Sequence, residues 1–280
     1  MRKLTFIFVV TVLCPFFLIA QHYEVGVMLG GSTYMGDLVP ERKAISTGEY
    51  HFAGGAFVRY NHSEMFAAKL AVNYGNISAA DANSSVAGRR ARNLSFKSPL
   101  FETSLTGEIN ILGYDSKYLT RTFSPYVFMG VSWYKFNPQA ELDGVLVDLQ
   151  PLGTEGQGLE EFPDRQPYKL SGFAIPFGGG LKFALNDIIN IGAEVGMRKT
   201  FTDYLDDVSQ FYAGDDLLIE SGKETTLLLS NRTGSPKTSE ARRGNPNQKD
   251  LYIFGGLTIS INLSDNGGRR SNRAVGCPKF

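Results

Sequence analysis

The most regular feature of the chain is the alternation of apolar and polar residues near its end, between Asp250 and Leu263. One parity carries Leu251, Ile253, Gly255, Leu257, Ile259, Ile261 and Leu263, and the other carries Tyr252, Phe254, Gly256, Thr258, Ser260 and Asn262. Period-two alternation is the pattern of a β-strand with two different faces. The run exceeds the usual soluble strand of about five or six residues and reaches the roughly ten residues that a tilted strand needs to cross a bilayer. The segment is therefore predicted to be a membrane-spanning strand.

The same alternation recurs in other segments, which predicts about eight strands in all. The copies run over residues 23–32, 52–61, 66–74, 101–111, 125–136, 170–185 and 189–198. The connections alternate in length: residues 61–65, 112–123 and 186–188 are short turns, and residues 34–50, 76–97, 137–167 and 202–249 are long. This is the arrangement of an antiparallel transmembrane β-barrel with short periplasmic turns and long extracellular loops. An even number of strands then places both chain ends in the periplasm.

A soluble β-sandwich is the alternative fold, because its strands alternate as well. Three features favour the barrel: the length of the strands, an export signal, and aromatic residues near the predicted strand ends, where the membrane interface lies. These aromatics are Tyr60, Tyr74, Trp133 and Tyr134. The fold is therefore predicted as all-β, a closed barrel of about eight strands.

The first twenty residues have the composition of a signal peptide. Arg2 and Lys3 precede an apolar run over residues 4–18, and cleavage is expected between Ala20 and Gln21. A lipoprotein signal at Cys14 is disfavoured by its neighbours Leu13 and Pro15. No later stretch has eighteen consecutive apolar residues, so no transmembrane helix is predicted. The expected organisation is a signal peptide over 1–20, an outer-membrane barrel over 21–263 and a basic periplasmic tail over 264–280.

The polar parity of the predicted strands collects four acids and four bases. These are Glu24, Arg59, Lys69, Glu102, Glu108, Lys182, Glu194 and Arg198. The interior of an eight-stranded barrel is just wide enough for side chains to fill, and charges buried there are costly unless they are paired. The equal numbers predict pairing across the lumen, and hence a filled barrel rather than a diffusion pore. A proton or ion path is the alternative role for these residues.

Little in the sequence points to catalysis. Of the three histidines, only His51, at the outer end of a predicted strand, is placed to act as a base, and no nucleophile elbow accompanies it. The net charge of zero gives no indication of nucleic-acid binding. The protein is therefore expected to be non-enzymatic, with no cofactor and no small-molecule substrate. A lipid-modifying enzyme that uses His51 is the less favoured interpretation.

Two further segments invite a specific chemistry but favour a structural interpretation. The acidic loop residues Asp203, Asp206, Asp207, Asp215 and Asp216 offer oxygen ligands for calcium, yet they lack the spacing of an EF-hand loop. We expect instead an acidic loop that is solvated or whose carboxylates pair with basic residues. Residues 178–180 are three consecutive glycines inside a predicted strand with no helix after them, which favours a kink or tight packing over a phosphate cradle.

The predicted tail is basic, with four cationic residues against the single acid Asp265. It carries Arg269, Arg270, Arg273 and Lys279, together with Cys277, which has no partner once the signal peptide is removed. The tail is either a flexible end or a docking segment for an acidic periplasmic partner. Cys277 is either free or bonded to a partner, and no disulfide framework or cysteine-based metal site is predicted.

Four segments resemble one known family. They are RKTFTDYLDDVS at residues 198–209, YMGDL at 34–38, LQPLGTEG at 149–156 and IPFGGG at 175–180. Together they look like the PorG-like outer-membrane barrels of the type IX secretion system, which are also catalogued as a domain of unknown function. The first segment is the most specific, and the family hallmark is carried over to Arg198, Lys199, Thr200, Asp203, Tyr204, Asp206 and Asp207. We expect this segment to fix the exit of the chain from strand to loop at the outer rim.

The resemblance implies a role in moving cargo proteins across the outer membrane. It implies association with a periplasmic ring, made of a lipoprotein and its partner subunit, and no catalytic residue. The barrel is then surrounded by outer-membrane lipid and is not itself the translocation pore. The alternative function is a small binding or adhesion barrel that acts through its extracellular loops.

Overall fold

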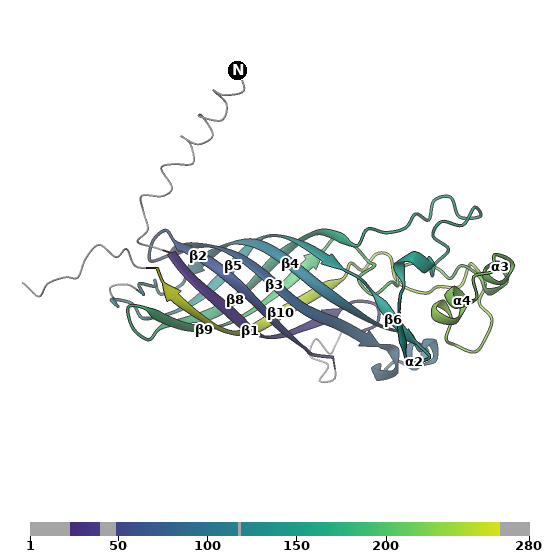
Figure 1. The fold of residues 1–280 in the computed structure, drawn as a ribbon, viewed down its shortest axis with the longest axis horizontal. Helices are drawn as coiled ribbons and strands as arrows, with labels where there is room; N and C mark the ends of the chain where they lie inside the picture. The colour runs from purple at the N-terminus through teal and green to yellow at the C-terminus, as the bar shows by residue number, and fades with distance from the viewer. Residues whose placement is uncertain (1–22, 40–48, 117–118, 264–280) are drawn as a thin grey trace, which may run out of the picture.

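The chain forms a closed antiparallel β-barrel with a folded cap at one end in a computed structural model, which describes residues 23–39, 49–116 and 119–263 (Figure 1). The signal peptide, His22, and the tail with Arg269, Arg270, Arg273 and Cys277 lie outside the described residues. Among the described residues, no helix is both long enough and apolar enough to cross a membrane.

Eight strands make up the barrel wall. They are β1 (Tyr23–Met35), β2 (His51–Asn61), β3 (Phe66–Ala80), β4 (Ser95–Asn110), β5 (Phe123–Phe136), β8 (Ser171–Ala184), β9 (Ile189–Thr200) and β10 (Leu251–Asn262). Each strand pairs with its neighbours in the chain, and β1 pairs with β10 to close the cylinder. All eight segments predicted from alternation are strands, so the predicted fold class is confirmed.

In the middle of the wall, apolar side chains point outward and polar side chains point inward. On β3, Phe66, Leu70 and Tyr74 are each more than half exposed, whereas Lys69 and Asn73 are 5% exposed. This polarity is the reverse of that in a water-soluble protein, and it is the polarity of a barrel with lipid around it. The strands therefore have the surface of a membrane-spanning barrel of the outer-membrane type.

Towards the cap the polarity of the wall reverses. The inward residues Tyr34, Ile77, Tyr134 and Tyr252 are apolar or aromatic and at most 1% exposed, and they belong to a hydrophobic core between barrel and cap. Tyr134 was predicted to lie at the membrane interface, and that prediction is wrong because its side chain points into this core. The outward-facing Trp133 and Tyr74 are 39% and 56% exposed, as lipid-facing aromatics are.

The three glycines of β8 allow close packing of the wall. A Cβ atom built on Gly178 would lie 2.2 Å from the carbonyl oxygen of Val195, and one on Gly180 would lie 2.8 Å from the ring of Tyr126. Both distances are shorter than real Cβ contacts, so no side chain fits at either position. The glycines serve tight packing within the barrel, as their position in a strand predicts.

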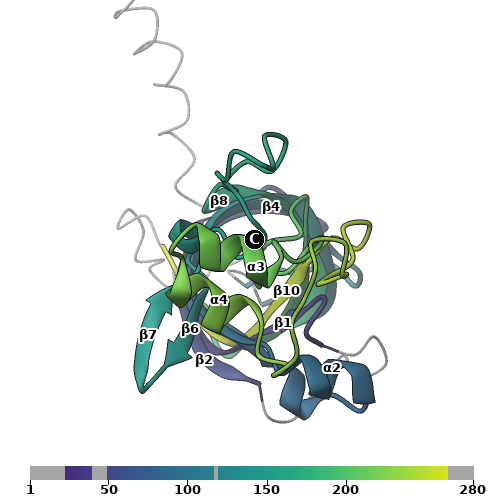
Figure 2. The ribbon, with the colours of Figure 1, turned by 90° about the vertical axis from the view of Figure 1, so that its right-hand side faces the viewer.

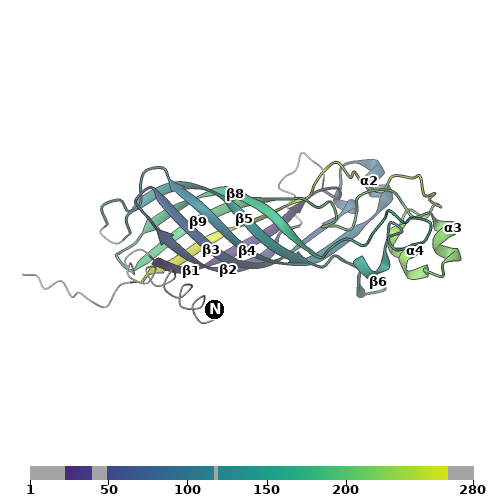
Figure 3. The same cartoon turned by 90° about the horizontal axis from the view of Figure 1, so that it is seen from above.

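Short helices and a hairpin form the cap, which we define as residues 81–94, 137–170 and 201–250 (Figures 1 and 2). Its elements are η3 (Asp81–Asn83), α2 (Ala87–Arg92), β6 (Gln139–Leu142), β7 (Val145–Asp148), η4 (Gln150–Leu152), α3 (Asp215–Glu220) and α4 (Glu224–Ser230). The loop predicted at 76–97 is shorter than expected, because β3 continues to Ala80 and β4 already begins at Ser95. Both described ends of the barrel, near Tyr23 and Asn262, lie at the opposite end (Figure 3).

Candidate functional site

The first group of polar residues inside the barrel is an ionic network centred on Glu108. Its carboxylate accepts from Arg59 Nε at 2.9 Å and from Lys182 Nζ at 2.5 Å, and Lys69 Nζ lies 3.6 Å away. Arg59 also donates to Glu24 through Nη1 at 2.8 Å. All five side chains are at most 6% exposed. One buried carboxylate therefore holds cations from three different strands.

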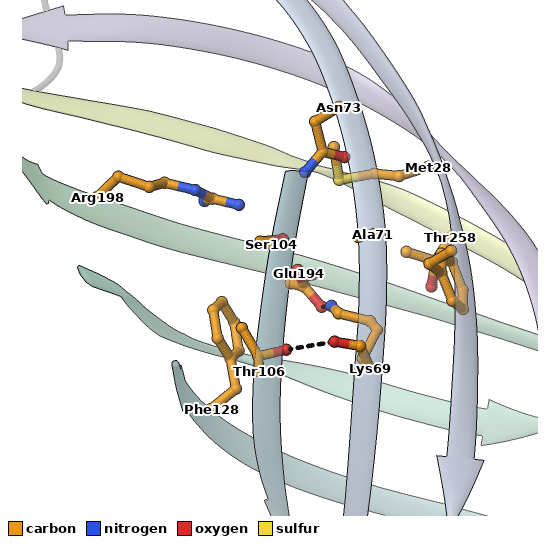
Figure 4. Close-up of a pocket in the computed structure, with 11 residues that line it drawn as sticks. Met28, Lys69, Ala71, Asn73, Ser104, Thr106, Phe128, Glu194, Arg198 and Thr258 are labelled. Carbon is orange, nitrogen blue, oxygen red and sulfur yellow. Dashed lines mark hydrogen bonds and ion pairs between the residues drawn. The ribbon is translucent and has the colours of Figure 1, made fainter. Parts of the chain in front are cut away.

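Glu194 extends this network across the lumen from β9. It pairs with Lys69, and the hydroxyl of Tyr126 donates to the same carboxylate at 2.5 Å. Figure 4 shows the side chains of Lys69 and Glu194 directed towards each other. The cavity beside them, lined also by Thr106, Phe128 and Arg198, measures about 10 Å³, which is room for about one water molecule.

A second ionic group lies nearer the cap, around Glu102. Arg198 donates to it through Nε at 3.0 Å and through Nη2 at 3.2 Å, in a two-pronged contact. Tyr252 donates its hydroxyl to Glu102 at 2.8 Å and Asn73 donates at 2.9 Å, so both carboxylate oxygens are occupied. The structure thus brings all eight charged residues of the polar parity into the lumen, each in an ion pair. The two groups fill the interior of the barrel with side chains.

Residues 198–209, at the end of β9 and directly after it, join the cap to the barrel. The hydroxyl of Tyr34 lies 2.7 Å from Asp206 Oδ2 and 2.8 Å from Asp250 Oδ1. The other oxygen of Asp250 accepts from the backbone N–H of Leu205 at 2.9 Å, and Thr200 Oγ1 donates to the carbonyl of Asp250 at 2.7 Å. This joint fixes where the chain leaves the wall.

The two aspartates of this joint meet at one hydroxyl group, that of Tyr34. A single hydroxyl hydrogen on Tyr34 serves only one of the two carboxylates, so the second short contact requires a proton on a carboxyl group. Burial, followed by the charge of Asp37, raises the pKa of Asp206. Burial, followed by the charge of Asp206, raises the pKa of Asp250. Like charges held close together out of water disfavour double ionisation.

A buried arginine organises the centre of the cap. Arg243 lies 3.2 Å from Glu155 and 3.3 Å from Asp207, and all three side chains are at most 2% exposed. Asp207 also accepts from Thr154 at 2.5 Å and from Tyr168 at 2.7 Å. Burial raises the pKa of Asp207 to about 6, against the opposing charge of Arg243. Arg243 thereby links the chain before β8 to the chain after β9.

Tyr204 and Lys199 complete the hallmark segment. The ring of Tyr204 stacks on that of Tyr168, with ring centroids 4.7 Å apart, and its hydroxyl donates to Glu155 at 3.2 Å. Lys199 points outward from β9 and is exposed. No sequence pattern singled out Arg243, and Glu155 stood out only as part of the resembling segment at residues 149–156, because the two lie in irregular loops and meet only after the chain has closed the barrel.

The acidic loop was predicted to be solvated or paired with basic residues, and the second alternative holds for Asp207, which pairs with Arg243. Asp203, Asp206 and Asp207 are at most 3% exposed. Asp215, at the start of α3, accepts from Asn231 at 2.8 Å. In the part of the chain that the structure describes, no three acidic, histidine or cysteine side chains gather in a way that would hold a metal ion. Asp206, Asp207 and Asp215 are held by hydrogen bonds or by Arg243, whereas both carboxyl oxygens of Asp203 are buried without a hydrogen-bond partner among the described residues.

Asp203 makes the stability of the cap depend on pH. Burial raises its pKa to about 7 from 3.8, so between these values the folded cap binds a proton that the unfolded chain has released. The stabilisation of the cap is complete below pH 3.8 and is lost as the pH rises through about 7. We expect Asp203→Asn to reduce this decline, with Asp206, Asp207 and Asp250 supplying the remainder, measured as the urea midpoint of the cap from a fluorophore on its surface.

The exposed cap residue Asp164 supplies the control for that experiment. Asp164→Asn removes the same charge without a buried carboxyl, so it should decline like the wild type. An Asp203→Asn variant with the wild-type pH profile would show that another group is responsible.

His51 makes a contact that the sequence did not predict. Its Nε2 atom lies 2.6 Å from Ser78 Oγ on the neighbouring strand β3. A serine and a histidine in contact are two parts of a nucleophilic site, which also needs an orienting group and donors for the oxyanion. The pair is better described as a hydrogen bond that links β2 to β3 at the rim.

The chain is similar to one protein family and to several solved structures. The model of the domain of unknown function DUF6089 matches residues 2–150. Among solved structures, the neisserial surface protein A is similar with 8% identity and a TM-score of 0.40, over 86% of this chain and 96% of that one. Ail, the attachment invasion locus protein of Yersinia pestis, has 10% identity and a TM-score of 0.39, over 86% and 97%. OprG of Pseudomonas aeruginosa has 9% and 0.36, over 86% and 93%. No curated protein matches the sequence.

Proposed function

The chain belongs to the family of the domain of unknown function DUF6089, and from this premise we propose that it is a non-enzymatic component of the type IX protein secretion system in the outer membrane. In this role the barrel anchors and stabilises the periplasmic ring, made of a lipoprotein and its partner subunit. The ion-paired lumen carries the proposal. A protein cargo does not fit through an interior with about 10 Å³ of space beside Lys69 and Glu194, so the barrel acts through its surfaces. The resemblance of residues 198–209 to the PorG-like barrels supports the assignment to this machinery.

The proposed orientation places the cap outside the cell and both chain ends in the periplasm. The apolar wall supports a position in the lipid bilayer, and the described ends at Tyr23 and Asn262 lie together, opposite the cap. In this orientation residues 1–20 are removed on export. The tail over 264–280, with Arg269, Arg270, Arg273 and Cys277, then faces the ring and docks to an acidic surface on it.

Affinity purification from detergent-solubilised membranes tests this role. We expect the periplasmic ring subunits to co-purify with the full-length protein, and deletion of the gene to abolish secretion of type IX cargo. A deletion strain with intact secretion and lost surface binding would overturn the proposal in favour of a binding barrel that acts through its loops.

Neutralising the tail should separate docking from folding. We expect the triple variant R269Q, R270Q and R273Q to insert normally but to lose the ring subunits on purification, because the charge that attracts an acidic partner is gone. The matched control is Arg121→Gln, at the same end of the barrel, where the arginine already pairs with Glu64 at 3.2 Å. Equal recovery of the ring subunits from both variants would rule out the tail as the docking segment.

A further inference from the structure

A basic cleft opens on the cap between α2 and the chain that follows α4. Its volume is about 310 Å³, within the range of small-ligand sites. The polar residues of its lining are Arg92, Tyr212, Thr233, Ser235, Lys237 and Arg242. Three of these residues are cationic, three carry hydroxyl groups and none is acidic. The lining therefore has the composition of a site for a negatively charged group.

One wall of the cleft is fixed by Arg92. Its guanidinium pairs with Asp81 through Nε at 2.7 Å and through Nη2 at 2.8 Å. It also donates to the backbone carbonyls of Asp37, at 3.2 Å, and of Arg243. Arg92 is therefore balanced in charge and acts as a brace that ties α2 to the rest of the cap.

The opposite wall is fixed by backbone pairing. Phe211 and Arg242 form an antiparallel bridge, and the N–H of Tyr212 donates to the carbonyl of Ala241 at 3.0 Å. The N–H of Asp215 donates to the carbonyl of Lys237 at 2.9 Å. The backbone positions of Lys237 and Arg242 are thus fixed before any ligand binds, which lowers the entropic cost of binding.

The charges of Lys237 and Arg242 are not neutralised by ion pairs within the described part of the cap. Neither side chain forms an ion pair with another described residue, in contrast to Arg92 and Arg243. Glu240, which lies between Lys237 and Arg242 in the sequence, is exposed, and Asp215, whose backbone N–H donates to Lys237, accepts with its side chain from Asn231 at 2.8 Å. On α2, Arg89 follows the lining residue Gly88 in the sequence, and its Nη1 atom is buried without a hydrogen-bond partner among the described residues.

We propose that this cleft binds an oxyanionic group, a phosphate or sulfate ester, with Lys237 and Arg242 as its charged contacts and the hydroxyl of Ser235 as a neutral donor. Arginine and lysine are the side chains that recognise such oxyanions, and charge-assisted hydrogen bonds to them are about twice as strong as neutral ones. The ester belongs either to a lipid headgroup or to a soluble sugar phosphate. The site does not rest on the secretion role proposed above, because its residues belong to the cap and not to the tail.

Binding assays on the full-length protein in detergent micelles test the site, with two probes that separate the sources. The soluble probe is glucose 6-phosphate, with glucose as its uncharged counterpart. The lipid probe is lipid A dispersed in the same micelles, with phosphatidylcholine, whose headgroup has no net charge, as its counterpart. We expect the double variant K237Q and R242Q to weaken binding of the charged probe roughly tenfold or more.

The control variant removes the same net charge elsewhere in the cap. Lys169→Gln combined with Lys223→Gln lies outside the cleft lining, so it should bind the charged probe like the wild type. Binding of either charged probe with this selectivity supports the site, and the probe that binds identifies the source. Equal weakening in both double variants, or no binding of either charged probe, would overturn the proposal. Cargo secretion should be unchanged in the cleft variant, which keeps this result separate from the secretion role.

Discussion

Replacing Glu108 with alanine is expected to destabilise the barrel by about 3–5 kcal/mol, the cost of breaking a buried ion pair by removing one partner. Glu108 lies within ion-pair distance of Arg59, Lys69 and Lys182, and its removal leaves the three cations of this network with two carboxylates, Glu24 and Glu194. The measurement is urea unfolding in lipid vesicles. The single tryptophan, Trp133, faces outward from β5 and reports on transfer from lipid to water.

Two comparisons make that prediction specific. Glu64→Ala breaks the exposed pair with Arg121, whose side chains are about half exposed, and should cost less than about 1 kcal/mol. Combining Glu108→Ala with Lys182→Met removes the one excess cation and should recover part of the loss. A Glu108→Ala barrel as stable as Glu64→Ala would mean that the lumen charges are solvated and the interior is open.

Arg243→Met is expected to loosen the cap while the barrel stays folded. The substitution leaves Glu155 and Asp207 buried without a cation, at a cost of about 3–5 kcal/mol. Proteolysis of the folded protein in vesicles should then cut within residues 201–250 and spare the strands. The adjacent exposed residue supplies the control, because Arg242→Met removes the same charge without unpairing a buried acid.

Acid should partly restore the loosened cap. Asp207 has a pKa of about 6 even with Arg243 in place, and losing that cation moves the pKa further up. Below this pH the carboxyl is protonated in the folded cap and no longer needs a cation. The urea midpoints of the variant and the wild type should therefore differ at neutral pH and lie closer together at acidic pH. A variant equally loose at both pH values would show that Arg243 acts through packing alone.

The barrel could be predicted from the sequence because its wall follows one repeating pattern of apolar and polar residues. A residue that faces lipid is apolar and its neighbour in the lumen is not, so alternation marks each strand wherever lipid surrounds it. The rule fails where lipid ends. At Ile77 and Tyr134 the inner face becomes apolar to pack against the cap, which is why β3 is longer than predicted and why Tyr134 points inward.

The cap could not be predicted from the same pattern. Its helices have six or seven residues, such as Ala87–Arg92, which is too short for an apolar stripe of helical period to appear. Its central pair joins Glu155 to Arg243, eighty-eight positions apart along the chain, and no local pattern encodes such a contact. The charged residues of the lumen could be predicted because they lie on the alternating strands. Which of them pair with each other could not, because that depends on the register of the closed barrel.

The central claim is that ion-paired side chains close the lumen, so that the protein works through its surfaces. Conductance of the purified full-length protein in planar lipid bilayers tests this claim most directly. We predict that insertion of the wild-type protein produces no stable ionic channel, while Glu108→Ala, with its cations unpaired, produces transient openings. A steady, ohmic conductance from the wild-type protein would contradict the account.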